Sequence, residues 1–246
     1  MDHHYSKPWR SKLTRALPLL LISLALILIF STGLHKYLSF ENFKMHRETL
    51  LAWTNEHALL SSVIFVVIYT VAVAVSIPGA TILTLVGGFL FGPVFGSILV
   101  IFSATTGATL LYLAVRTSLG HWLSSRATGW ISLMRDGFQE NAFSYLLFLR
   151  LVPIFPFWVV NIIPALLGVS ATTFIVATFF GIIPGSVVYV LVGHGLSHLF
   201  ASNQTPNLRL IFEPTVLYPL LALAALSLLP VIYQKIFKNK KGMKHD

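Results

Sequence analysis

Long uncharged stretches alternate with short charged ones along this chain. Leu17–Leu34 is an 18-residue run without a charged side chain, near the lower limit for a membrane-spanning helix. Ala58–Val115 is far longer, with 58 residues and no Asp, Glu, Lys, Arg or His. Asn141–Gly193 is a second long block in which Arg150 is the only charged side chain, and Pro214–Tyr233 is a last candidate span. This pattern predicts an all-α integral membrane protein.

Both long blocks contain helix-breaking residues in their interiors. A helix rises about 1.5 Å per residue and about 20 residues cross a bilayer, so the first block must fold back on itself. Its breaks, Pro78-Gly79 and Gly92-Pro93, leave in effect 12 residues between them, too few for an ordinary crossing. The second block is broken at Pro153, Pro156, Pro164, Gly168 and Pro184-Gly185. We therefore expect a re-entrant hairpin in each block, which is tolerated only where protein or water covers the broken backbone.

Helix-breaking residues occur in the same order and at similar spacings in the two blocks. Pro78 and Gly92 are 14 residues apart and Pro153 and Gly168 are 15 apart, and a Phe–Gly spacing of 5 follows in each block. Each unit is predicted to be a hairpin followed by one long helix. If each unit crosses the membrane fully only once, the next unit has the opposite orientation in the membrane. This arrangement is the inverted repeat of many secondary transporters. Chance similarity of two apolar segments is the alternative.

The charged segments predict the orientation of the chain. Both tails are rich in Lys and Arg, so the positive-inside rule places both in the cytoplasm and requires an even number of spans. The hairpin interpretation gives five spans: 17–34, 58–76, 97–116, 170–193 and 214–233. Counting 79–95 as a crossing gives six. The fold class is therefore five or six spans with two inverted re-entrant hairpins.

Three parts are predicted along the chain. Residues 1–57 form a basic tail, an anchor helix and a connector at the membrane interface; a signal peptide is the alternative for 17–34, but no small-x-small cleavage site follows it. Residues 58–195 form the central domain, in which 116–141 joins the two repeats along the interface. Residues 196–246 supply a loop, the last span and a second basic tail.

Composition excludes several classes of function. The chain is 56% hydrophobic and 10% charged, whereas soluble domains carry about 25% charged residues, so a water-soluble enzyme is excluded. It has no cysteine, hence no disulfide or thiol chemistry. The net charge of +9 flanks apolar spans, which favours anionic lipid and argues against nucleic acid. His194 and His198 have a zinc-binding spacing but no third ligand, so we expect no metal, no cofactor and no enzymatic activity.

Arg150 is the strongest candidate for a functional side chain. A charge within a membrane span usually faces a cavity or a partner, and the five donors of a guanidinium match a phosphate group. Binding a lipid phosphate is one role for Arg150. Capping carbonyls freed by Pro153 and Pro156, and reaching back to the interface, are the alternatives. Arg116, which closes the first block, is predicted to be an interface anchor.

The remaining candidate residues belong to the hairpins. Pro78, Gly79, Pro153 and Pro156 are expected at the hairpin turns, where half-helix N-termini can present N–H groups to an anion. A second group is expected to support the hairpins by close packing or by hydrogen bonds to freed backbone: Gly88, Gly92, Asn161 and Gly168. The GxxxG spacing of Gly88 and Gly92 is typical of close helix packing. Asn161 could alternatively contact substrate.

Two segments resemble the signatures of a known family. The run Leu149–Pro156 (LRLVPIFP), with Asn161 and Gly168 downstream, resembles the second signature of the VTT-domain proteins, also called the DedA or SNARE-associated Golgi protein superfamily. Pro78-Gly79 followed by the run 87–92 (GGFLFG) resembles the first. The FPF form and the following Asn are similar to the yeast Golgi-type branch, which has many bacterial members. The resemblance covers about residues 60–195.

This resemblance implies two inward-facing re-entrant hairpins and a membrane protein that handles lipids. Eukaryotic members scramble phospholipids, and bacterial members are linked to flipping polyprenyl phosphate or phospholipids and to proton-dependent transport. Many DedA proteins carry an acid just after the first proline motif, whereas no Asp or Glu lies in any apolar stretch of this chain. That departure argues against coupling through a carboxylate.

The functional expectation is a lipid translocator whose partners are phospholipids or polyprenyl phosphate. The alternatives are a membrane-organising scaffold that moves no lipid and an ion-coupled carrier of a small solute. A homo-oligomer is left open. By analogy with compact members of the family, we expect the inner membrane of a bacterium.

Overall fold

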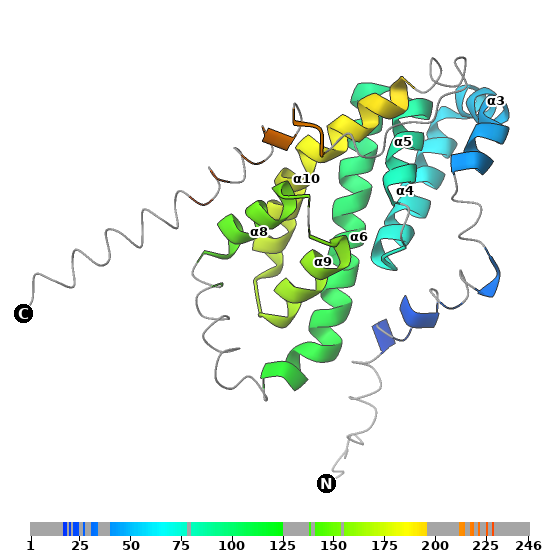
Figure 1. Ribbon diagram of the computed structural model, residues 1–246. Helices are drawn as coiled ribbons and strands as arrows, with labels where there is room; N and C mark the ends of the chain where they lie inside the picture. The colour runs from blue at the N-terminus through cyan, green and yellow to red at the C-terminus, as the bar shows by residue number, and fades with distance from the viewer. Residues whose placement is uncertain are drawn as a thin grey trace, which may run out of the picture.

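The computed structural model describes residues 40–77, 80–124, 141–153 and 155–195, together with Phe138 and scattered short stretches near both ends of the chain. Helices account for all the regular structure in these ranges, as the sequence predicts (Figure 1). In chain order they are α3 (Phe40–Glu56), α4 (Ala58–Ala74), α5 (Ala80–Phe91), α6 (Pro93–Ser124), α8 (Ala142–Leu151), α9 (Phe157–Leu166) and α10 (Ala171–His194).

Glycine and proline set several of the helix ends. Gly92 has a φ of 75° and turns the chain from α5 into α6. Pro93 takes the first position of α6, where a missing N–H breaks no helical hydrogen bond. Gly168, with a φ of 74°, ends α9 in a Schellman motif in which Val169 N donates to Pro164 O at 3.1 Å. These breaks follow the sequence pattern directly.

Two predicted breaks are wrong. Pro164 lies inside α9 and Pro184 lies inside α10, which continues from Ala171 to His194. A proline removes only one N–H, and in membrane helices neighbouring groups satisfy the carbonyl that it frees. Pro184 therefore does not divide α10, the long helix of the predicted second repeat.

The two predicted repeats pack against each other through their short and long helices. α4 packs against α6 and α8 packs against α10, so the first short helix of each pair contacts the long helix of its own repeat. α5 packs against α10 as well as α6, and α9 packs against α6, so the second short helix of each pair contacts the long helix of the other predicted repeat. α6 and α10 also pack against each other, and Figure 1 shows α6 as the long helix at the middle of the bundle.

Glycines allow these crossings to be close. A Cβ on Gly88 of α5 would collide with the backbone of Val190 in α10, and a Cβ on Gly193 of α10 would collide with the backbone of Leu85. A Cβ on Gly96 would lie 2.6 Å from Gly87 O. A Cβ on Gly92, in contrast, would meet nothing within 4 Å, so this glycine serves the turn and not the packing.

Two described stretches are long and apolar enough to cross a membrane, Pro93–Ser118 and Ala171–His194. α4, α5, α8 and α9 are apolar but shorter. α4 and α6 direct large apolar side chains outward, including Leu59, Val94 and Phe102, as expected of helices that face lipid. The predicted spans at 17–34 and 214–233 lie largely outside the described residues, so the total of five or six spans stays a prediction.

Candidate functional site

Arg150 joins three helices. It lies in the last turn of α8, and its Nη2 donates to Asn161 Oδ1 of α9 at 2.6 Å and to Thr178 Oγ1 of α10 at 2.9 Å. Asn161 and Thr178 are both fully buried. A charged donor makes stronger hydrogen bonds than a neutral one, so this contact fixes the end of α8 against both neighbouring helices.

Two aromatic rings complete the surroundings of the guanidinium. Arg150 Cζ lies 5.3 Å from the ring centroid of Phe157 and 5.5 Å from that of Phe174. A guanidinium within about 6 Å of an aromatic ring is attracted by the negative charge of the ring face. We call these five residues the guanidinium site: Arg150, Phe157, Asn161, Phe174 and Thr178.

Gly181 makes room for Arg150. A Cβ at this position of α10 would lie 2.5 Å from Arg150 Cβ and 3.0 Å from Arg150 Cγ. Any side chain at Gly181 would push the Arg150 stem away from α10. Gly181 thus allows the close approach of α8 to α10 at the guanidinium site.

The guanidinium site has hydrogen-bond donors to spare. Arg150 Nε and Nη1 and Asn161 Nδ2 are buried and have no hydrogen-bond partner among the described residues. The five N–H bonds of an arginine are shared among Nε, Nη1 and Nη2, so three of them are unused here. Arg47 pairs with Glu48 on α3, and no carboxylate of the described residues pairs with Arg150. Each unpaired buried donor costs about 1–3 kcal/mol, a cost that an acceptor oxygen or an anion placed beside it would offset.

The contacts of Arg150 differ from two of the roles considered from the sequence. Within the described residues its hydrogen bonds go to side chains and not to carbonyls freed by Pro153 or Pro156. Its unpaired nitrogens are buried, whereas a side chain that reaches back to the interface would expose them. Binding an anion therefore remains the interpretation that uses the open donors.

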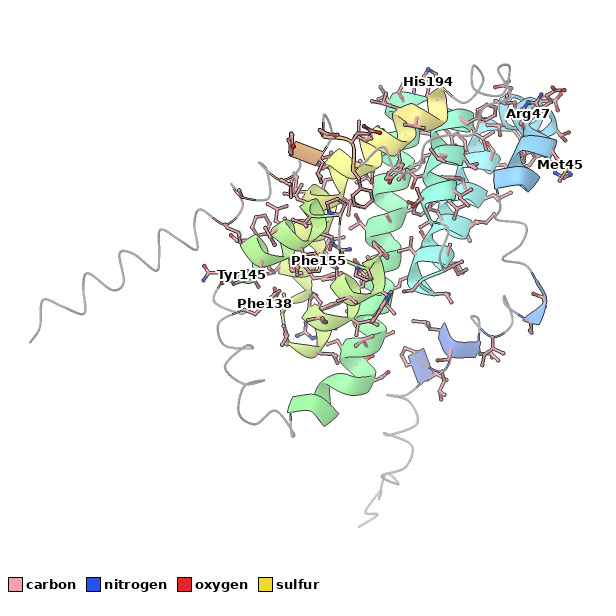
Figure 2. The ribbon with its side chains drawn as sticks, in the orientation of Figure 1. Met45, Arg47, Phe138, Tyr145, Phe155 and His194 are labelled. Carbon is pink, nitrogen blue, oxygen red and sulfur yellow. The ribbon has the colours of Figure 1, made fainter. Side chains whose placement is uncertain are left out.

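The predicted turn residues of the second hairpin lie between α8 and α9. Pro153 follows α8, and Pro156 is the N-cap of α9. Phe155, in the same turn, is 41% exposed (Figure 2). Pro78 and Gly79, predicted for the first turn, lie outside the described residues. His194 ends α10, His198 lies beyond the described helix, and no group of three potential metal ligands occurs in the ranges searched.

Arg116 also makes internal contacts. Its Nη1 donates to Tyr112 Oη at 2.6 Å and to Val169 O at 3.1 Å, and the Tyr112 hydroxyl donates to the same carbonyl. Val169 belongs to the short connection between α9 and α10. Arg116 is thus more than the interface anchor that the sequence predicts, because it ties this connection to α6.

Sequence reasoning selected Arg150 and Asn161 but missed Thr178, Phe157 and Phe174. Thr178 is a polar side chain in the middle of a largely apolar helix, and it lies four residues after Phe174 and three before Gly181. This helical spacing places the three on one side of α10. The spacing could have been noticed, but which face of α10 meets Arg150 depends on tertiary packing.

Residues 77–195 match the family model of the VTT domain. This chain is a VTT-domain protein. The match confirms the resemblance drawn from LRLVPIFP and GGFLFG, and it includes the whole guanidinium site and Gly181. Assignment to the yeast Golgi-type branch stays a prediction.

Several similar proteins are transmembrane proteins. The chain is 34% identical over 204 residues to transmembrane protein 41 homolog of Dictyostelium discoideum, which covers 81% of this chain and 59% of the relative. It is 32% identical over 180 residues to the Drosophila melanogaster homolog, and this match covers 72% of this chain and 54% of the relative. It is 32% identical over 169 residues to human transmembrane protein 41B, and this match covers 67% of this chain and 56% of the relative.

This VTT-domain chain thus spans between 54% and 59% of the length of these three relatives. No solved structure is significantly similar to it. The domain and the relatives make the chain an integral membrane protein. The bacterial inner membrane and the cytoplasmic tails stay predictions from the sequence.

Proposed function

We propose that this VTT-domain protein moves lipids with a phosphate head group from one membrane leaflet to the other. The observation that carries the proposal is the buried guanidinium of Arg150 with three unused N–H bonds. Phospholipids and polyprenyl phosphate both offer acceptor oxygens with negative charge, and both are candidate substrates. The lipid tails would stay in the bilayer while the head group passes the guanidinium site.

Electrostatics explains how such a site would lower the barrier to crossing. An isolated charge in a medium of low dielectric constant is very unfavourable, and pairing with an opposite charge at good geometry offsets much of that cost. Arg150 has no charged partner among the described residues, so a phosphate would give the guanidinium the partner it lacks. Both charges would then be compensated part-way across the membrane.

The start of α9 adds to this attraction. The first amides of a helix, here those of Phe157 and Trp158, have no acceptor within the helix, and the N-terminus carries a partial positive charge. Pro156 at the N-cap has no side-chain oxygen to occupy these amides. Because the Phe157 ring contacts the guanidinium, the α9 N-terminus and Arg150 lie close enough to act on one anion.

The proposal includes two re-entrant hairpins, α4–α5 and α8–α9. All four helices are apolar, and each packs against one or both of the long helices, as expected of half-spans covered by protein. Hairpins that meet within the membrane would locally thin the apolar barrier. An ion-coupled carrier is less well supported, since no Asp or Glu lies within α4, α5, α6, α8, α9 or α10.

The test is a lipid-flip assay in proteoliposomes. Fluorescent phospholipid and labelled polyprenyl phosphate would be used with wild type, Arg150→Ala, Arg150→Lys and, as a matched control, Arg47→Ala on α3. Arg47 pairs with Glu48 at the surface, so its loss removes an arginine without touching the guanidinium site. We expect Arg150→Ala to lose movement of at least one lipid, Arg150→Lys to retain part of it, and Arg47→Ala to match wild type.

Folding is checked by size-exclusion chromatography and circular dichroism of each variant. A well-folded wild type that moves neither lipid, with or without an imposed ion gradient, would contradict the proposal and favour a membrane-organising scaffold. Movement that depends on the gradient would favour a coupled carrier.

A further inference from the structure

A continuous stack of side chains links Arg150 to α6. The rings of Tyr112 and Phe174 are stacked, with centroids 4.4 Å apart and an interplanar angle of 17°. The Phe174 ring contacts the Arg150 guanidinium, and the Arg116 guanidinium lies 5.8 Å from the centroid of the Tyr112 ring. Both rings are fully buried, so this stack belongs to the protein interior and is not a path for lipid.

Hydrogen bonds fix the α6 end of the stack. Tyr112 and Arg116 both donate to the carbonyl of Val169, and Arg116 also donates to the Tyr112 hydroxyl. We call Tyr112 and Arg116 the α6 clamp. Since Tyr112 and Arg116 are one helical turn apart on α6, the clamp offers two donors in a fixed arrangement to one backbone carbonyl.

The clamp holds the connection between the two helices that surround Arg150. α9 ends at Leu166 and α10 begins at Ala171, and Val169 lies between them. α9 supplies Phe157 and Asn161 to the guanidinium site, and α10 supplies Phe174 and Thr178. All four contacts of Arg150 therefore come from helices whose junction is tied to α6.

We infer that Tyr112 and Arg116 are positioning residues that set the orientation of the Arg150 guanidinium through Phe174 and the α9–α10 connection. Neither residue needs to touch the lipid. The inference rests on the proposed function for what the positioned guanidinium does, but the position itself can be measured without lipid movement. With the clamp removed, Phe174 is free to shift, and the guanidinium loses one wall of its surroundings.

The experiment observes Arg150 directly by NMR. Protein labelled with ¹⁵N-arginine is reconstituted in lipid nanodiscs, and the Nε–Hε signal of Arg150 is identified by its absence in Arg150→Lys. Aromatic ring currents shift the resonance of a nearby proton, and burial slows its exchange with water. The signal therefore reports both the position and the burial of the guanidinium.

The variants separate the stacked rings from the hydrogen bonds. Tyr112→Leu removes both the ring and the hydroxyl, Tyr112→Phe keeps the ring, and Arg116→Gln weakens the clamp while leaving both stacked rings in place. Tyr69→Leu is the matched control, because it removes a buried tyrosine whose hydroxyl bonds to Thr84 and which belongs to neither the guanidinium site nor the α6 clamp. Flip rates and thermal unfolding are measured in parallel.

We expect Tyr112→Leu to shift the Arg150 signal and to speed its exchange by about tenfold, the effect that loss of one stacked aromatic pair can produce. Tyr112→Phe and Arg116→Gln should give smaller shifts in the same direction, and Tyr69→Leu should give none. In the flip assay, the rate should fall in the order of the NMR shifts and not in the order of thermal stability.

An Arg150 signal that is unchanged in folded Tyr112→Leu would overturn the inference. If Tyr112→Leu does not fold, unchanged signals in both Tyr112→Phe and Arg116→Gln would overturn it equally. If wild type moves no lipid but the signal shifts as expected, the proposed function fails and the positioning inference stands. If wild type moves lipid and the signal does not shift, the proposed function stands and the positioning inference fails.

Discussion

The two pairs of short helices are cross-linked by different chemistry. In the α4–α5 pair, Tyr69 Oη and Thr84 Oγ1 are 2.9 Å apart and buried, and Thr84 also donates to Ala80 O at 2.9 Å. In the α8–α9 pair, Arg150 and Asn161 make the corresponding link at 2.6 Å. The first link is neutral, and the oxygens of both its side chains have partners. The second is charged and leaves Arg150 Nε, Arg150 Nη1 and Asn161 Nδ2 unpaired.

This difference assigns different roles to two units of similar architecture. A neutral, satisfied hydrogen bond contributes about 1 kcal/mol and asks for no further ligand. A buried guanidinium with unused donors destabilises the protein unless something else binds it. We therefore propose structural support in the first pair and substrate contact in the second. The variants below are designed to break or sharpen this contrast.

The largest effect is expected at Gly88, where the first pair meets the other repeat. In Gly88→Ala the new methyl group would collide with the backbone of Val190, which cannot move aside like the end of a flexible side chain. We expect destabilisation of about 3 kcal/mol or more, seen as loss of monodisperse protein in detergent. Monodisperse Gly88→Ala protein with wild-type stability would contradict the close contact of α5 with α10. Gly92→Ala, in contrast, tests the turn between α5 and α6.

A smaller effect on folding but a larger one on function is expected at Gly181. In Gly181→Ala the methyl group meets the Cβ and Cγ of Arg150, which are side-chain atoms that can shift at a cost of roughly 1–3 kcal/mol. The guanidinium would move with them. We expect thermal stability to fall moderately and the flip rate to fall close to that of Arg150→Ala. A folded variant with wild-type flipping would show that the position of Arg150 does not matter.

The two cross-links can be compared by removing one polar side chain from each. Asn161→Leu deprives Arg150 of one of its two hydrogen-bond partners, and Thr84→Val removes the neutral link while keeping the shape of the side chain. We expect each to lose about 1–3 kcal/mol of stability, measured by thermal unfolding. Only Asn161→Leu should slow lipid movement, by about tenfold or more. Equal slowing by both would remove the functional contrast.

The smallest effect is expected at the end of α4. Ser76 has a φ of 57°, and Ile77 N donates to Ala72 O at 2.9 Å, as in a Schellman motif with serine in the usual position of glycine. Its hydroxyl is buried and unpaired. Ser76→Gly should stabilise the protein by about 1 kcal/mol, read as a higher unfolding temperature, because glycine adopts this conformation without strain. A decrease would indicate that the hydroxyl has a partner in the membrane.

Much of the helix pattern was predictable from sequence because glycine and proline act locally. Gly92, Pro93 and Gly168 end or begin helices where the pattern indicates. Pro184 does not, because tolerance of a proline inside a membrane helix depends on neighbouring groups that the local sequence does not contain.

The site was predictable only at its centre. Arg150 stands out as the one charge in a long apolar block, and Asn161 as a polar group near it in sequence. Thr178, Phe174 and Tyr112 come from two other helices, between 24 and 38 residues from Arg150 along the chain. Thr178 and Phe174 reach Arg150 because α8 packs closely against α10 at Gly181, and Tyr112 reaches Phe174 because α6 packs against α10. No local pattern specifies these helix contacts.

The central claim is that a lipid phosphate binds the guanidinium of Arg150. Solid-state NMR can measure it directly through the dipolar coupling between ³¹P of the lipid and ¹⁵N of Arg150, with ¹⁵N-arginine protein in phospholipid bilayers and Arg150→Lys to identify the signal. We predict that ³¹P reduces the Arg150 Nε or Nη1 signal, and that Gly181→Ala weakens this reduction. An Arg150 signal unaffected by ³¹P, in bilayers where arginines at the membrane surface are affected, would contradict the account.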